Sequence, residues 1–173
     1  PDMSTDVSPR LAVAIERFLK SMAAEKAASP HTLKGYREDL LQCGEFLASA
    51  GCQTPADATS VLLRRYAAAL HASGYAASTV ARKLASMRSF YRFGQREGWV
   101  KANPARPVKS PRRTRPLPSF LTNDEILRLL GAPRGESLGD VRDRAILELM
   151  YSSGVRVSEL HGLDDHDLDL AGG

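Results

Sequence analysis

The stretch "STVARKLASMRSFYRFGQREG", residues 78–98, carries two residue patterns along one predicted helix. Apolar residues recur every three or four positions, so they share the side of a helix that packs against a core. These core residues are Val80, Leu84, Met87 and Tyr91. The opposite side holds arginines and small residues, namely Ala81, Arg82, Ala85, Ser89, Arg92 and Arg96. The stretch therefore predicts an amphipathic helix with one cationic face.

Three further helices are predicted before this stretch. Ser8-Pro9 and Ser29-Pro30 each place a serine N-cap before a first-turn proline, a pattern typical of helix starts. A third helix is expected over about 59–73, with Gly74 as its C-terminal glycine. The stretch quoted above supplies the fourth helix, which ends at Gly98. The first hundred residues therefore predict a four-helix domain.

A proline-rich segment follows, "KANPARPVKSPRRTRPLPSF", residues 101–120. Its five prolines forbid a continuous helix and favour an extended, fairly stiff linker between two domains. The linker is strongly basic and is expected to touch a polyanion through Lys101, Arg106, Lys109, Arg112, Arg113 and Arg115.

A second domain is predicted over residues 121–173. Thr122 and Glu125 form a capping-box pattern at its first helix, and "GDVRDRAILELMYSSG", residues 139–154, supplies another helix that turns sharply at Gly154. The final "DLDLAGG", residues 167–173, is typical of a strand entry. About fifty residues that end on an unpaired strand make a poor core, so we expect the chain to stop inside this domain.

Charge is distributed unevenly behind a net value of +4. Of the 24 Lys and Arg residues, 13 lie between Ala58 and Pro118, where Glu97 is the only acidic residue. A basic block of this density favours a polyanionic partner, because each phosphate contact releases condensed counterions. A merely solvated surface is the alternative. It is disfavoured because solubility alone calls for mixed charges.

Other features narrow the class of protein. No apolar run reaches the length of a membrane span. Cys43 and Cys52 lack metal-ligand spacing and favour a reducing cytoplasm. On the predicted cationic helix face, small residues permit close approach to a groove and arginines reach phosphates or guanine edges. Such faces also occur against solvent alone. With no acidic residue on this face in the sequence, nucleic acid is the favoured ligand.

The run "RDRAILELMYSSGVRVSELHGLDDHDLDL", residues 142–170, resembles the start of the catalytic domain of the tyrosine recombinase (phage integrase) family, in its XerC/XerD-like branch. The resemblance extends to the first domain, where Ser29, Thr32, Tyr36, Asp39 and Leu40 fit the pattern of the family's core-binding domain. It implies a mainly α fold. Residues 1–100 would form a four-helix core-binding (SAM-like) domain, 101–120 a linker, and 121–173 the first helices of an α+β catalytic domain.

The family's reaction follows from the resemblance. A tyrosine attacks a DNA phosphate, forms a 3′-phosphotyrosyl link and needs no metal or other cofactor. Arg156 matches the first catalytic arginine, whose planar fork suits two phosphate oxygens better than a lysine would. Glu159 matches an acidic supporting position, with an ordinary salt bridge as the alternative. The family's remaining catalytic motifs, including the nucleophile, fall beyond Gly173, so this fragment is expected to be inactive.

DNA contacts are also implied by the resemblance. In relatives, the starts of the second and fourth helices meet the DNA, and the two domains form a C-shaped clamp around a duplex. Arg82 is the best candidate for a base contact, and Arg88, Arg92 and Arg96 are candidates for phosphate contacts. The remaining implied contacts are His31, Thr32, Lys34 and Ser86.

Three functions remain open at this point. The leading one is a cytoplasmic recombinase that resolves chromosome dimers, in a tetrameric synapse with a paralogous recombinase and with a septal DNA translocase (FtsK-like). A phage, integron or transposon integrase of the same chemistry is the close rival. A DNA-binding module without catalysis is the third.

Overall fold

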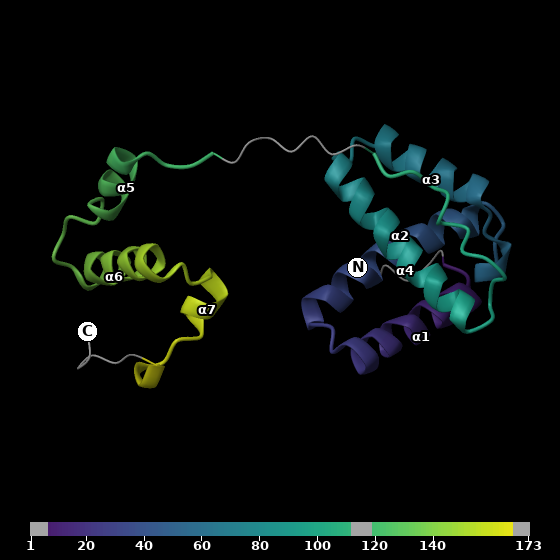
Figure 1. Cartoon of the computed structure of the whole chain (residues 1–173), viewed down its shortest axis with the longest axis horizontal. Helices are drawn as coiled ribbons and strands as arrows, with labels where there is room; N and C mark the ends of the chain where they lie inside the picture. The colour runs from purple at the N-terminus through teal and green to yellow at the C-terminus, as the bar shows by residue number, and fades with distance from the viewer. Residues whose placement is uncertain (1–6, 112–118, 168–173) are drawn as a thin grey trace. The chain divides into compact units, whose positions relative to one another are not determined.

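The computed structural model of the chain describes residues 7–111 and 119–167. The chain divides into two compact units, Pro1–Arg115 and Pro116–Gly173 (Figure 1). The described residues are mostly helical and include no strand, which confirms the predicted mainly α fold. Among the described helices, none combines the length and the apolar composition needed to span a lipid bilayer.

Four helices build the first unit: α1 (Pro9–Lys26), α2 (Pro30–Ser49), α3 (Ser60–Ala72) and α4 (Ala77–Arg96). A short 3-10 helix, η1 (Pro55–Asp57), precedes α3. The predicted helix starts are confirmed, because the Ser8 and Ser29 hydroxyls accept hydrogen bonds from backbone N–H groups of the first turns of α1 and α2. Gly74 and Gly98 both have a positive φ, which suits the turns after α3 and α4.

The core of the first unit lies around α4, which packs against α1, α2 and α3. The four predicted core residues of α4 are each at most 3% exposed. The buried side is wider than predicted, since Ala81, Phe90 and Phe93 are also buried. Phe93 packs against Phe18 of α1, with ring centroids 5.5 Å apart. Ala81 therefore does not belong to the open cationic face. A helix surrounded by three others buries more of its circumference than a single apolar stripe indicates.

The segment after α4 differs from the predicted extended linker. Ala105 is 1% exposed and Val108 is 2% exposed, and both belong to the core of the first unit. Two hydrogen bonds tie the segment to α4: Asn103 Nδ2 donates to Arg88 O, and Arg88 Nη2 donates to Val108 O. Residues 101–111 are therefore packed on the helices. Arg112, Arg113 and Arg115, predicted to contact DNA, lie outside the described residues.

The second unit contains α5 (Asn123–Leu130), α6 (Leu138–Ser153), α7 (Val157–His161) and the short 3-10 helix η2 (Asp165–Asp167). The predicted capping box is present, with Glu125 Oε2 accepting from the Thr122 N–H at 2.8 Å. Helices α5, α6 and α7 bury none of their residues, and Leu138 is 91% exposed. The described helices of this unit therefore do not close a core among themselves. Most of the predicted strand entry, residues 168–173, lies outside the described part of the chain.

The packing of the segment after α4 predicts a stability effect. Val108→Ala removes two buried carbons and should lower the free energy of unfolding of the first unit by about 1.5–3 kcal/mol. Trp99, the only tryptophan of the chain, packs against Phe90 and Phe93 and can report unfolding by its fluorescence in denaturant. The matched control is Val61→Ala on the exposed side of α3, expected to change stability by less than about 0.5 kcal/mol. Equal effects of the two changes would contradict the core position of Val108.

Candidate nucleic-acid interface and catalytic arginine

The turn between α6 and α7 presents Arg156 at the surface. Gly154 takes a left-handed conformation with φ 65°, and its N–H donates to Met150 O at the end of α6. Arg156 then has an extended backbone at the N-cap position of α7. Its side chain is 80% exposed. The local sequence therefore places a guanidinium on an exposed turn, away from any apolar interior.

Glu159 holds Arg156 from one helical turn away. Its Oε2 accepts from the Arg156 backbone N–H at 2.8 Å, and its Oε1 accepts from Arg156 Nη1 at 2.8 Å. These two bonds, the backbone one first, lower the pKa of the Glu159 carboxyl below its ordinary value. Within the described residues, the hydrogen bonds leave Arg156 Nε and Nη2 without an acceptor. The arrangement orients the fork and keeps two donors for an anionic ligand.

Arg82 on α4 is partly engaged by an acidic residue of α2. Its Nη1 donates to Asp39 Oδ2 at 2.5 Å, while the Arg82 side chain stays 52% exposed. Ser86, predicted to contact DNA, is 4% exposed and donates its hydroxyl to the same Asp39 oxygen at 2.8 Å. The structure thus places Ser86 in the interior of the first unit, against Asp39.

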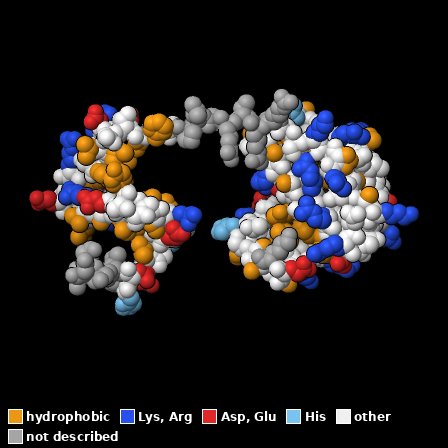
Figure 2. Space-filling view, in the orientation of Figure 1, with side chains coloured by type: hydrophobic (Ala, Val, Ile, Leu, Met, Phe, Trp, Pro, Cys, Tyr) orange, Lys and Arg blue, Asp and Glu red, His pale blue; other side chains and the backbone are white. Residues whose placement is uncertain are grey.

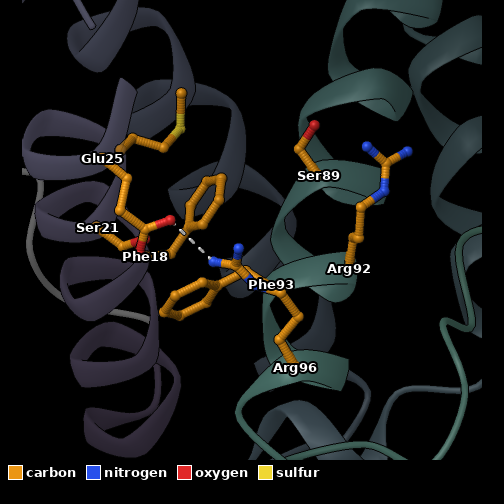
Figure 3. A pocket seen from close by; sticks show the side chains of 8 residues that line it. Phe18, Ser21, Glu25, Ser89, Arg92, Phe93 and Arg96 are labelled. Carbon is orange, nitrogen blue, oxygen red and sulfur yellow. Dashed lines mark hydrogen bonds and ion pairs between the residues drawn. The ribbon is translucent and has the colours of Figure 1, made fainter. Parts of the chain in front are cut away.

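Arg96 is engaged by a second acidic residue, on α1. Its Nη2 donates to Glu25 Oε2 at 3.2 Å. Both side chains line a pocket between α1 and α4, together with Phe18 and Phe93 (Figure 3). Figure 3 shows the Arg96 guanidinium turned toward Glu25, whereas Arg92 extends away from α1. The expectation that no acidic residue balances the α4 arginines is therefore wrong. Asp39 and Glu25 come from neighbouring helices, so the α4 sequence alone did not show them.

Arg92 remains available on the α4 surface. With Arg88, Gln95, Asn103 and Arg106 it lines a hollow between α4 and the segment that follows it. Arg88 is fixed there by its bonds to Val108 O and to Ser110 Oγ. The ion pairs of the described residues do not include Arg92 or Arg106. A concave surface with unpaired arginines suits the phosphates of a nucleic-acid backbone.

The predicted contacts at the start of α2 are all on the surface. His31, Thr32 and Lys34 are exposed, and the Thr32 hydroxyl shares a hydrogen bond with Ser29 Oγ at 2.9 Å. Lys34 Nζ lies 4.0 Å from Glu38 Oε1, a weak surface pair. Lys and Arg side chains are spread over the visible face of the first unit (Figure 2). A helical unit with this surface is typical of proteins that bind nucleic acids.

Comparisons with known proteins identify the family. The model of the phage integrase N-terminal SAM-like domain matches residues 15–98, and the phage integrase family model matches residues 119–173. A relative from Thermodesulfovibrio yellowstonii, named "Tyrosine recombinase XerC", is 43% identical over 159 residues, covering 92% of this chain and 52% of the relative. One of the same name from Pelobacter propionicus is 44% identical over 161 residues, covering 92% and 53%. The chain belongs to the phage integrase family of tyrosine recombinases.

The chain spans about half the length of the curated relatives it matches. A solved structure described as "Crystal structure of XerA recombinase" is 25% identical, with a TM-score of 0.46, and covers 91% of this chain and 52% of that chain. The family assignment rests on the sequence matches.

The Arg156–Glu159 pair predicts a pH effect that NMR can measure. Because the folded-state pKa of Glu159 is lowered, its contribution to the start of α7 is complete above its ordinary pKa of 4.5. That contribution is lost as pH falls through the lowered value. Arg156→Ala should raise the Glu159 pKa only part of the way, since the backbone N–H bond remains.

The measurement is a side-chain carboxyl titration of Glu159 in the wild-type chain and in the variant. Arg142→Ala, which removes an exposed arginine paired with Asp143 in the same unit, is the control and should leave the Glu159 pKa unchanged. A wild-type Glu159 pKa at 4.5 would contradict the observed geometry.

Proposed function

We propose that this chain supplies the DNA-binding unit and the first catalytic arginine of a site-specific tyrosine recombinase. The reaction is DNA strand cleavage and rejoining through a 3′-phosphotyrosyl intermediate. One observation carries the proposal: Arg156 stands exposed at the start of α7, oriented by Glu159, inside the region that matches the phage integrase family model.

Arg156 acts on the scissile phosphate in this proposal. Charge builds on the non-bridging oxygens as the phosphate is attacked, and fixed donors aimed at that charge lower the barrier. One guanidinium nitrogen is held by Glu159, so the fork is set before DNA arrives. Because its pKa is lowered, the Glu159 carboxyl stays ionised at neutral pH and keeps its hydrogen bond to the Arg156 guanidinium.

The attacking tyrosine is not assigned to this chain. Tyr66 and Tyr91 are buried in the first unit, and burial raises the pKa of both phenols, which disfavours the phenolate. The chain spans about half the length of its relatives, and by family resemblance the nucleophile lies in the part of that length which this chain does not span. We therefore expect the chain on its own to bind DNA without cleaving it.

The first unit binds the duplex in this proposal. Arg92 and Arg106 contact phosphates beside the hollow on α4, and His31, Thr32 and Lys34 approach the duplex from the start of α2. Arg82 is the candidate for a base contact. Arg88 and Arg96 are already engaged by protein groups, so they contact phosphates only with the donors left over.

We also propose the biological process in which the whole protein acts. The curated relatives carry the name XerC, which favours the Xer type over integrases of mobile elements. On this view the whole protein acts in the cytoplasm on chromosome dimers, in a synapse with a paralogous recombinase. A septal DNA translocase then regulates the exchange.

A substitution at Arg156 separates catalysis from binding. The test uses a protein that joins this chain to the remaining length found in its relatives. Arg156→Lys keeps the charge and loses the fork, so covalent trapping on a nicked duplex should fall by about 100- to 1,000-fold. Duplex affinity should be unchanged, because that affinity comes mainly from the first unit.

Arg142→Lys is the matched control, an exposed arginine of the same unit outside the α6–α7 turn. It should preserve trapping. Trapping by Arg156→Lys at the wild-type rate would remove Arg156 from the catalytic assignment.

A further inference from the structure

A buried carboxylate joins α2 to α4. Asp39 is 1% exposed and accepts hydrogen bonds from three α4 side chains. Lys83 Nζ donates to Oδ1 at 3.0 Å, while Ser86 Oγ and Arg82 Nη1 donate to Oδ2 at 2.8 and 2.5 Å. The family pattern in the sequence includes Asp39 but assigns no partner to it.

The three donors differ in their access to solvent. Lys83 and Ser86 are buried, and the Lys83 ammonium also lies 5.6 Å from the centre of the Tyr75 ring. These two contacts fix the carboxylate, because a buried charge is retained only when it is paired and hydrogen-bonded. Of the three donors, only Arg82 extends from the Asp39 carboxylate into solvent.

The hydrogen bond to Asp39 determines which N–H groups of Arg82 remain free to bind a ligand. With Nη1 on Asp39, the Nε–H and Nη2–H groups form the free edge of the guanidinium and have no hydrogen-bond acceptor among the described residues. Two parallel donors of this kind fit two adjacent acceptors, such as guanine O6 and N7 or two phosphate oxygens. A side chain held in advance also loses less conformational entropy on binding.

We propose that Asp39 is a positioning residue for DNA recognition, which holds Arg82 so that its Nε–Nη2 edge meets a pair of acceptors on the duplex. Asp39 itself touches no DNA. The inference rests on the proposed function, in that it requires the α4 surface to face DNA.

The test is a double-mutant cycle between Asp39 and Arg82. Binding is measured on a duplex selected by this chain from a random-sequence pool, and on a scrambled duplex of the same length. Arg82→Ala should weaken binding to the selected duplex by about 5- to 150-fold. Asp39→Asn should weaken it by about 3- to 20-fold in the wild-type background, and by less than about 2-fold in the Arg82→Ala background.

Asp39→Asn leaves the buried Lys83 cation without its partner, so a second variant guards against misfolding. Asp39→Asn combined with Lys83→Met removes both buried charges, and Trp99 fluorescence in denaturant reports whether the first unit remains folded. Lys83→Met alone is the matched control. The Asp39 carboxylate keeps its bonds to Ser86 and Arg82, so this variant should lose less affinity than Asp39→Asn does.

The outcomes separate the inference from the function on which it rests. Losses confined to the selected duplex place the Arg82 edge on a base, and equal losses on both duplexes place it on phosphates; either result supports positioning by Asp39. Wild-type binding by the folded Asp39→Asn/Lys83→Met variant would overturn it, since Asp39 would then serve only to balance Lys83. Additive losses in the cycle would also overturn it. Failure of the wild-type chain to bind either duplex would instead refute the proposed function.

Discussion

The burial of α4 among α1, α2 and α3 is the constraint on which the first unit depends. Because one helix supplies the centre of the core, its arginines are fixed by the same packing that buries Leu84 and Met87. Asp39 engages Arg82 near the start of the helix, and Glu25 engages Arg96 near its end. Arg92, between them, is left facing a hollow. The ion pairs of the neighbouring helices thereby divide a row of similar residues into anchored and available cations.

In the second unit, residues close to Arg156 in the sequence determine its position. Gly154 turns the chain, and Glu159 is three residues from the arginine it holds. Neighbouring residues are enough to expose and orient Arg156, so the sequence alone could predict its position. Helices α5, α6 and α7 still bury none of their residues. The described helices of this unit therefore supply only part of the site proposed around Arg156.

Contacts between neighbouring residues could be predicted from the sequence, whereas contacts between distant residues could not. Helix starts at Ser8 and Ser29, the turn at Gly154 and the core stripe of α4 all follow from neighbouring residues, and the structure confirms them. The pairing of Asp39 with Ser86 joins residues 47 positions apart, and that of Arg96 with Glu25 joins residues 71 apart. The burial of Val108 likewise depends on how the chain folds back. A single sequence holds no local signal for such contacts, so the cationic face was predicted to be more uniform than it is.

In the proposed function, the α4 surface of the first unit lies against a nucleic-acid backbone. The most direct test is the dependence of duplex affinity on salt concentration, compared between the wild-type chain, Arg92→Ala and Arg17→Ala. Arg17 is an α1 arginine already paired with Glu97. If the α4 surface faces the backbone, Arg92→Ala should lower the slope of log affinity against log salt by about 1, while Arg17→Ala should leave it unchanged. An unchanged slope for Arg92→Ala, or an equal loss for Arg17→Ala, would contradict it.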